Sequence, residues 1–309
     1  MVKLNNITLS VVVPFFNEEK GIKEFHDNLV KSLYWVSHYE ILFINDGSTD
    51  NTLEHIKELA NQSNLKYLSF SRNFGHQSAI TAGINYATGN YIVIMDGDGQ
   101  DPPELLKDLY FKAKEGFDVV YAKRKKRKGE SFFKKATASI FYRLLKKLTS
   151  IDIPVDTGDF RIISRRIKLE FEKMNETNKF IRGMVSWVGY KQTFIEYERA
   201  ERKVGETKFG FSKMFNFAVD GLTAFSTVPL KLILYLGVIT SIISFLLIII
   251  ALLTFLFGDT VRGWTSMQIT ILFFSGIQLF SLGLIGQYLG RIFDEVRNRP
   301  YYIIEDSNV

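Results

Sequence analysis

The chain has no cysteine and only six prolines in 309 residues. The absence of cysteine excludes a disulfide framework, a thiolate metal site and a cysteine nucleophile. Residues 1–19 also lack the charged, apolar and small-residue regions of a secretory signal peptide, so none is expected. The remaining composition is 46% apolar and 23% charged with a net charge of +6, which excludes a wholly disordered chain.

Two long segments near the C-terminus carry no charged residue. Residues 232–257 are 26 uncharged residues in a row, and residues 264–290 are 27 more. Since about 20 apolar residues cross a bilayer core, the sequence predicts a transmembrane hairpin over residues 231–290. The alternative is a pair of buried core helices, which seldom run uncharged for this length.

Basic residues flank the predicted hairpin on both sides: Lys208, Lys213 and Lys231 before it, and Arg291, Arg297 and Arg299 after it. The positive-inside rule then predicts an integral protein of a bacterial-type inner membrane, with both termini and the N-terminal domain in the cytoplasm. Residues 291–309 are predicted to be a cytoplasmic tail.

Apolar residues at helical spacing over residues 209–230 predict juxtamembrane amphipathic helices, lying in the membrane interface or against the soluble domain. Gly286 and Gly290 form a GxxxG pair that permits close packing, either against the first span or against another copy. We expect a homo-oligomer.

The first 208 residues alternate short apolar runs with amphipathic helical patterns. The predicted strands are Thr8–Val13, Glu40–Ile44, Tyr67–Phe70, Tyr91–Met95 and Asp118–Tyr121. Runs apolar on both faces, separated by helices, are typical of a mostly parallel sheet covered on both sides. The sequence therefore predicts an α/β, Rossmann-like domain over residues 1–208.

Polar loops follow four of these strands, over residues 14–19, 45–50, 71–76 and 96–101. In parallel sheets the carboxyl ends of the strands form the ligand-binding edge. Asp96 and Asp98 flank one glycine, and such a pair of carboxylates suits Mg²⁺ or Mn²⁺ rather than Zn²⁺. A solvated turn is the alternative, which Asp46 on the neighbouring strand disfavours. The loop after the first strand has neither a Walker A sequence nor GxGxxG.

Four motifs together are similar to those of family 2 glycosyltransferases with a GT-A fold: VVVPFFNEE, INDGSTD, SRNFGHQSAITAG and MDGDGQDPPE. With GDFRIISR, GETKF and the paired C-terminal segments, the chain more closely resembles the polyprenyl-phosphate glycosyltransferases. These include dolichyl-phosphate mannose synthases and bactoprenol glucosyltransferases of the GtrB type. The resemblance covers nearly the whole chain.

The resemblance implies roles for individual residues. The donor nucleotide sugar would be bound by Pro14, Asn17, Glu18, Asp46, Asp96 and Gln100. Asp98, with Asp96, would hold the metal that bridges the donor diphosphate. Asp159 and Asp98 would be the catalytic carboxylates, with Asp159 acting either as a base or as an orienting or metal-binding residue. His76 is expected to line the pocket wall, since no second histidine lies at ligand spacing.

An anionic acceptor requires cations, and residues 123–128 are six basic residues in a row. Such a run is often merely solvated, and no aromatic interleaving supports nucleic-acid binding. The functional interpretation is attraction to membrane lipids and to a lipid phosphate. The chosen acceptor-binding residues are Arg124, Arg127, Ser131, Arg199 and Arg202.

The predicted function is inverting transfer of a hexose to polyprenyl (undecaprenyl) phosphate, with UDP-glucose favoured as donor. The alternatives are a dolichyl-phosphate-mannose-type synthase using GDP-mannose, another nucleotide-sugar donor, or a non-catalytic membrane scaffold or carrier for lipid-linked sugar. The expected partners are a nucleotide sugar, polyprenyl phosphate and membrane lipids.

Overall fold

The computed structural model describes residues 7–62, 65–125, 157–174, 176, 179–198, 228–257 and 263–309. The chain divides into two compact units. The first contains residues 1–146, 151–211 and 300–309, and the second contains residues 147–150 and 212–299.

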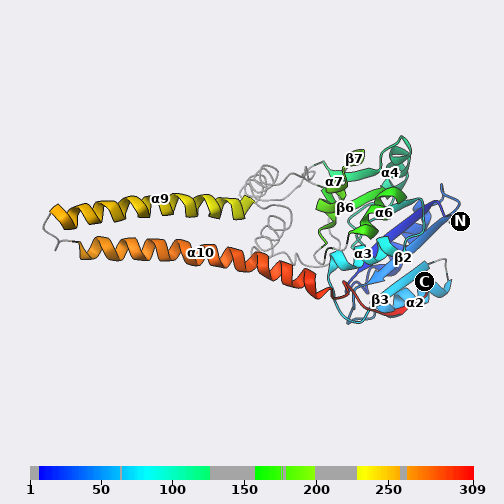
Figure 1. Ribbon diagram of the computed structural model, residues 1–309. Helices are drawn as coiled ribbons and strands as arrows, with labels where there is room; N and C mark the ends of the chain where they lie inside the picture. Colours follow the sequence, from blue (N-terminus) through cyan, green and yellow to red (C-terminus); the bar gives the residue numbers. More distant parts are fainter. Residues whose placement is uncertain are drawn as a thin grey trace. The chain divides into compact units, whose positions relative to one another are not determined.

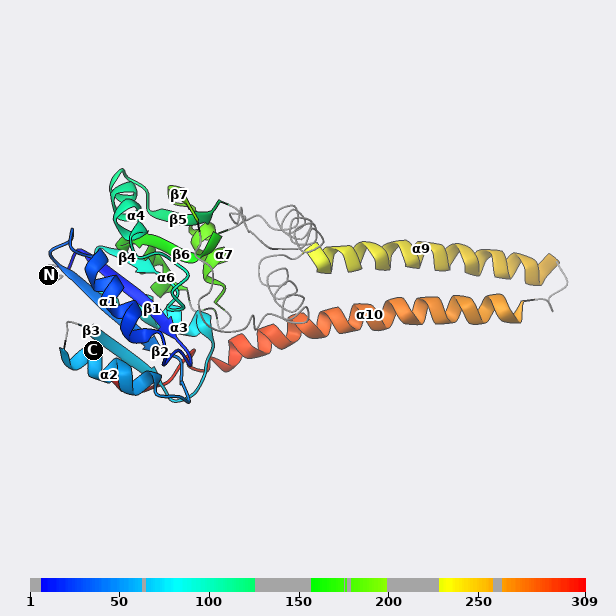
Figure 2. The same cartoon turned by 180° about the vertical axis from the view of Figure 1, so that it is seen from behind.

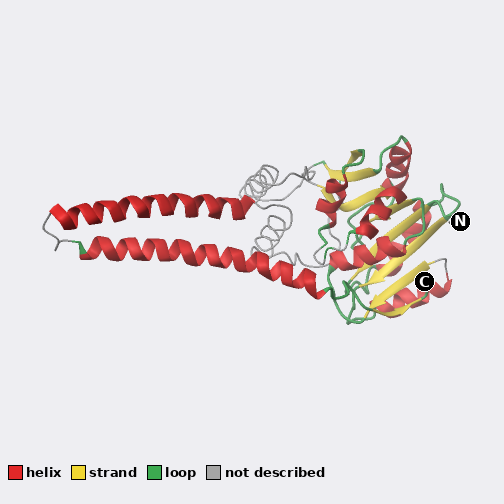
Figure 3. Ribbon diagram, in the orientation of Figure 1, coloured by secondary structure: helices red, strands yellow, loops and turns green. Residues whose placement is uncertain are grey.

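The described part of the first unit contains an eight-stranded sheet of order β7-β5-β6-β4-β1-β2-β3-β8 (Figure 1, Figure 3). Its strands are β1 (Leu9–Phe15), β2 (Tyr39–Asn45), β3 (Leu65–Phe70), β4 (Tyr91–Ile94), β5 (Val119–Arg124), β6 (Thr157–Ser164), β7 (Gln192–Tyr197) and β8 (Ile304–Ser307). The helices of this unit are α1 (Ile22–Ser32), α2 (Thr52–Gln62), α3 (His76–Tyr86), α4 (Leu105–Lys114), α6 (Arg165–Lys173) and α7 (Ile181–Val188).

The pairing pattern confirms the predicted α/β architecture. β1 pairs in parallel with β2 and β4, β2 with β3, and β5 with β7. β6 runs antiparallel to β4 and β5, and β8 runs antiparallel to β3. The five predicted strands correspond to β1 to β5, whereas β6, β7 and β8 were not predicted.

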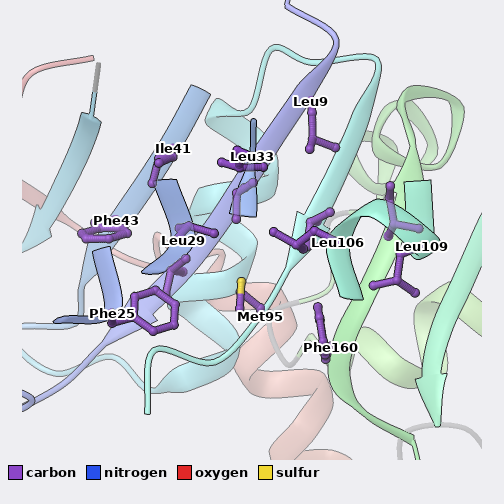
Figure 4. Close-up of a cluster of buried hydrophobic side chains, with 14 of the residues drawn as sticks. Leu9, Phe25, Leu29, Leu33, Ile41, Phe43, Met95, Leu106, Leu109 and Phe160 are labelled. Atoms are coloured by element: carbon purple, nitrogen blue, oxygen red, sulfur yellow. The ribbon is translucent and has the colours of Figure 1, made fainter. Parts of the chain in front are cut away.

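A core cluster lies between one face of the sheet and helices α1, α2 and α4 (Figure 2). Phe25, Leu29 and Leu33 from the α1 segment pack with Leu106 and Leu109 of α4 onto alternate residues of the strands (Figure 4). The buried residues of α3 contact β1 and β2 outside this cluster, on the other face. Because helices cover both faces, most residues of the central strands are apolar and buried.

The last strand, β8, joins the sheet at the edge next to β3. Asn308 ties it there, since its Oδ1 accepts from the backbone N–H of Tyr67 at 2.6 Å. Asp306 pairs with Lys57 at 2.7 Å. Residues 291–309 are therefore not a plain tail: helix α10 continues to Arg297, and the chain then supplies a strand to the first unit.

A buried carboxylate, Glu40, connects the amino ends of strands β1, β2 and β3. It accepts hydrogen bonds from Oγ of Ser10 (2.6 Å), the backbone N–H of Thr88 (2.6 Å) and Nζ of Lys66 (2.7 Å). Burial alone would raise the pKa of Glu40, but Lys66, Ser10 and Thr88 together hold it below its usual value. Ionised Glu40 therefore stabilises the fold.

We expect Glu40→Gln to lower the free energy of unfolding by about 2 kcal/mol, the range for hydrogen bonds to a charged group. Folding lowers the pKa of Glu40, so ionised Glu40 adds to the free energy of unfolding above about pH 4.5. This contribution is lost as the pH falls through the pKa that Glu40 has in the folded protein. Thermal unfolding of the full chain from pH 3.5 to 7 measures this. The exposed Glu54→Gln variant is the control, and equal melting profiles for both variants would contradict the assignment.

The second unit contains two long helices, α9 (Val228–Phe257) and α10 (Trp264–Arg297). They contact each other and run side by side (Figure 1, Figure 2). Among the described residues, no helix combines the length and the apolar character that a membrane span requires. The prediction of two membrane spans is therefore not confirmed.

Candidate active site

The loops after β1 and β2 hold each other at the carboxyl edge of the sheet. Oδ1 of Asn17 accepts from the backbone N–H of Thr49 (2.9 Å), and the N–H of Asn17 donates to Oγ of Ser48 (3.0 Å). The N–H of Glu18 donates to Oγ1 of Thr52 (3.0 Å). Asn17 has φ of 56°, a left-handed conformation that asparagine tolerates better than most residues. These bonds determine the backbone positions of two predicted donor-binding residues.

Asp46 joins the loop after β2 to the loop after β3. Its carboxylate accepts from the backbone N–H groups of Phe74 (2.7 Å) and Gly75 (3.0 Å). Burial raises the pKa of Asp46, and the two backbone donors oppose that rise. Gly47 has φ of 63°, and a Cβ there would lie 2.2 Å from the carbonyl carbon of Arg72. Glycine thus permits the two loops to meet.

Asp96, Gly97 and Asp98 form the turn after β4. A Cβ on Gly97 would lie 2.4 Å from the ring of Phe15, so glycine lets this turn pack against the end of β1. Oδ1 of Asp98 accepts from the backbone N–H of Gln100 at 3.1 Å, which shapes the turn. The two acidic residues therefore lie beside the first-strand loop, as the sequence predicted.

Asp159 lies near the start of β6, which reaches the same edge because β6 is antiparallel to β4. It is 6% exposed, and its two oxygens accept from Nε and Nη2 of Arg182 at 2.8 and 3.0 Å. The fully buried Arg161 also donates to Oδ1 of Asp159, at 3.3 Å. Nε2 of His76 lies 3.3 Å from Oδ2 of Asp159 and 3.4 Å from Oδ1 of Asp96. We name Asp159, Arg161, Arg182 and His76 the Asp159 cluster.

These contacts determine the charges of the cluster. Burial alone would raise the pKa of Asp159, but Arg182, His76 and Arg161 hold it well below its usual range. Burial alone would lower the pKa of His76, but Asp159 and Asp96 raise it to about 9. At neutral pH Asp159 is therefore ionised and His76 is protonated.

Negative charge also gathers around Asp96. Burial raises its pKa to about 6 and His76 opposes the rise, while the neighbouring carboxylates Asp101, Asp159 and Asp98 add to it. Within the described ranges, no three histidine, aspartate or glutamate side chains are grouped in a way that could hold a metal ion. The carboxylate oxygens of Asp96 and Asp98 nevertheless fit Mg²⁺ or Mn²⁺, since a divalent cation relieves the repulsion among these acids.

The four loops and Asp159 lie within a stretch of sequence that matches a known protein family. The family model of Glycosyl transferase family 2 matches residues 10–169, more than half of the chain. This range includes all four loops and Asp159. The chain belongs to glycosyl transferase family 2. The family resemblance of its motifs is thus confirmed, and the protein is a transferase enzyme.

The relatives of this glycosyltransferase match nearly its whole length. The uncharacterized glycosyltransferase YkcC of Bacillus subtilis is 51% identical over 305 residues, covering 98% of this chain and 94% of YkcC. The SfII prophage-derived bactoprenol glucosyl transferase of Shigella flexneri is 42% identical, covering 97% of this chain and 98% of the relative. Among solved structures, S. aureus TarS 1-349 in complex with UDP-GlcNAc has a TM-score of 0.51 at 19% identity. That match covers 71% of this chain and 66% of the TarS chain, and it shows a shared fold.

The glycosyltransferase fold brings most of the predicted site residues to one edge: Asn17, Glu18, Asp46, Asp96, Asp98, Gln100 and Asp159. Pro14 lies within β1, buried and paired with Ile44. Arg124 is the last residue of β5. Its Nη2 lies 2.9 Å from the position that a Cβ on Gly158 would occupy, so its guanidinium group is close to the start of β6. Arg127, Ser131, Arg199 and Arg202 lie outside the described residues. The individual binding roles remain predictions.

Sequence reasoning did not assign roles to two members of the Asp159 cluster, Arg161 and Arg182. Arg161 lies two residues after Asp159, and that spacing puts both on one face of a strand, which could have been recognised. No local pattern points to Arg182, because it comes from a different element. His76 was expected only to line the pocket, whereas its imidazole bridges Asp96 and Asp159.

Proposed function

We propose that this protein is an inverting glucosyltransferase that moves glucose from UDP-glucose to polyprenyl phosphate at the cytoplasmic membrane face. Relatives named bactoprenol glucosyl transferase, from Shigella flexneri and from Shigella phage SfV, support the sugar and the acceptor class. They are 42% and 41% identical over 97% of the chain. The observation that carries the proposal is the meeting of Asp96, Asp98 and Asp159 at the edge that also bears Asn17 and Asp46.

In the proposed reaction a phosphate oxygen of the acceptor attacks the anomeric carbon of glucose. The bond from that carbon to the diphosphate oxygen breaks, its electron pair leaves with UDP, and the linkage is inverted. A phosphate monoester, with a second pKa of about 6, is largely ionised at neutral pH, so the attack needs no general base. The low pKa of Asp159 makes it a poor proton acceptor and supports a role in orienting Arg182 and His76.

On the donor side, Asp96 and Asp98 would hold Mg²⁺ or Mn²⁺, with Gln100 beside them. When bound, the ion neutralises the negative charge that develops on the departing diphosphate. Protonated His76 adds a positive charge next to Asp96. Pro14, Asn17, Glu18 and Asp46 would line the nucleotide, since their loops meet at this edge.

On the acceptor side, Arg124 is the one chosen cation within the described residues, and it ends β5, the strand that pairs with the Asp159-bearing β6. Replacing Arg124 and Arg127 together with alanine should raise KM for polyprenyl phosphate roughly 10-fold or more, because charge-assisted bonds to phosphate are lost. KM for UDP-glucose should change little. Steady-state kinetics with each substrate varied in turn measures both constants, and an equal rise in the two would contradict the acceptor role.

We also propose that α9 and α10 insert into a lipid bilayer. Many large apolar side chains on these helices are exposed, for example Leu234 (63%), Phe245 (65%) and Phe280 (68%). Large exposed apolar side chains gathered on one element mark a surface that contacts a membrane or a partner protein, and their number on α9 and α10 favours a membrane. The uncharged segments of 26 and 27 residues support insertion as two spans.

Membrane insertion predicts that the full chain sediments with membranes after alkaline carbonate washing and is released by detergent. Carbonate removes proteins held by charge alone, because it neutralises lysine and leaves apolar contacts in place. Ile242→Lys with Ile243→Lys, both on the apolar part of α9, should weaken retention, whereas Lys57→Gln on α2 should not. Release of the wild type by carbonate would refute insertion.

The proposed reaction is tested by incubating the full chain, in detergent or vesicles, with radiolabelled nucleotide sugars and polyprenyl phosphate. We expect lipid-linked product from UDP-glucose in preference to UDP-GlcNAc and GDP-mannose. Product formed only from GDP-mannose would overturn the donor assignment. Absence of lipid product from every donor would overturn the proposed function.

A further inference from the structure

The short segment that follows α10 contacts the part of the chain that carries Arg182. The hydroxyl of Tyr301 donates to the backbone carbonyl of Lys179 at 3.4 Å, three residues before Arg182. Burial raises the pKa of Tyr301, and the side chain of Ser78, in the first turn of α3, opposes that rise. Tyr301 therefore contacts the entry of α7 and lies near α3, the helix that bears His76.

A second bond holds the entry of α7 from the same helix. The backbone N–H of Ile181, the first residue of α7, donates to Oε1 of Gln77 at 3.2 Å. The first N–H groups of a helix have no partner within the helix, and the side chain of the N-cap residue Phe180 makes no capping hydrogen bond to them. The start of α7 is thus positioned by Gln77 and Tyr301, which lie on other elements.

The exact placement of this helix start matters because Arg182 lies in its first turn. Arg182 presents both Nε and Nη2 to Asp159, and a two-point contact tolerates little displacement of the backbone that carries it. A shift at Lys179 or Ile181 would turn the guanidinium plane away from the carboxylate. Asp159 would then lose the contact that most strongly favours its ionised form.

The segment that carries Tyr301 is itself anchored by other contacts. The ring of Tyr302 stacks on Phe70 with centroids 5.0 Å apart and planes at 11°, and its hydroxyl oxygen accepts from Nδ2 of Asn85 at 3.3 Å. The carbonyl of Ile303 accepts from the N–H of Ser71 at 3.1 Å. Loss of the Tyr301 hydroxyl therefore leaves the segment in place while removing its contact with the α7 entry.

We propose that Tyr301 is a positioning residue for sugar transfer, acting through Lys179 and Arg182 on Asp159. The inference rests on the proposed function of the Asp159 cluster. It gives the C-terminal ten residues a part in the reaction, although none of them lies among the sequence motifs. Because Tyr301 acts on the orientation of Arg182, its loss should slow the reaction without weakening donor binding.

The test compares two matched variants of the full chain. Tyr301→Phe, which removes only the hydroxyl, should lower kcat roughly 10-fold, within the range known for small misplacements at active sites, with KM for UDP-glucose unchanged. Tyr302→Phe, which removes the neighbouring hydroxyl and keeps the stacked ring, should keep the wild-type kcat. An equal loss of kcat in both variants would show only a general structural role and overturn the proposal.

A double-mutant cycle then tests whether Tyr301 acts through Arg182. Arg182→Lys keeps the positive charge but cannot make the two-point contact. Adding Tyr301→Phe to Arg182→Lys should cause no further loss of kcat. An additive loss, or a wild-type kcat for Tyr301→Phe alone, would overturn this inference and leave the proposed function intact. A wild-type kcat for Arg182→Lys would count against the proposed role of the Asp159 cluster as well.

Discussion

Replacing Asp98 with alanine is expected to lower glucosyl transfer roughly 10³-fold. The variant removes one of the two carboxylates proposed to hold the cation, and metal stabilisation of a leaving group contributes several kcal/mol at about 1.4 kcal/mol per tenfold in rate. The fold should change little, because the Asp98 side chain shapes one turn through its bond to Gln100. Initial rates with radiolabelled UDP-glucose and polyprenyl phosphate measure the effect.

The control for Asp98→Ala is Asp108→Ala, which removes an exposed carboxylate from the first turn of α4 and should keep the wild-type rate. Excess chelator should abolish transfer by the wild type, and added Mg²⁺ or Mn²⁺ should restore it. Transfer that survives both the chelator and Asp98→Ala would refute the assigned metal site.

Replacing Asp159 with asparagine should have the second large effect, a loss of transfer of roughly 10²-fold or more, in the range for misplaced groups at an active site, because Arg182 and His76 lose the carboxylate that orients them. Asparagine keeps the shape of the side chain but removes its charge. Arg161, Arg182 and His76 would then be left as neighbouring cations without their shared counter-ion. Breaking a buried ion pair in this way costs about 3 kcal/mol of folding stability.

Three measurements separate the effects of Asp159→Asn. Transfer rates report the chemical step, calorimetry reports UDP-glucose binding, and thermal unfolding reports stability. We expect a lower rate and a lower melting temperature with donor affinity close to that of the wild type, while Asp108→Asn changes none of the three. Full activity together with full stability would rule out the proposed part of Asp159.

The apolar strands were predictable because burial on both faces leaves a local pattern. β1 to β5 follow the short apolar runs, with end shifts of a few residues. β6 was not predicted, because Asp159 and Arg161 interrupt its apolar residues and their mutual pairing is invisible in a local pattern. β8 has little apolar character and forms because the edge of β3 offers unpaired backbone groups.

The acidic part of the site was also predictable, since the loops after successive parallel strands must meet at one edge. Asp46, Asp96 and Asp98 could be placed there from the order of the strands. The partners of Asp159 could not be placed, because His76 and Arg182 lie on α3 and α7, far from Asp159 in the chain. Their distances depend on how these helices pack against the sheet.

The amino-acid sequence by itself determined the α/β class, the acidic loops at the strand ends and the two uncharged C-terminal segments. Each of these follows from periodicity, composition or strand order within a short stretch of chain. Only the tertiary structure decided that Arg182 and His76 hold Asp159, and that Tyr301 reaches the entry of α7. Such contacts join residues far apart in the chain, and the geometry that unites them exists only once the sheet and its helices have packed.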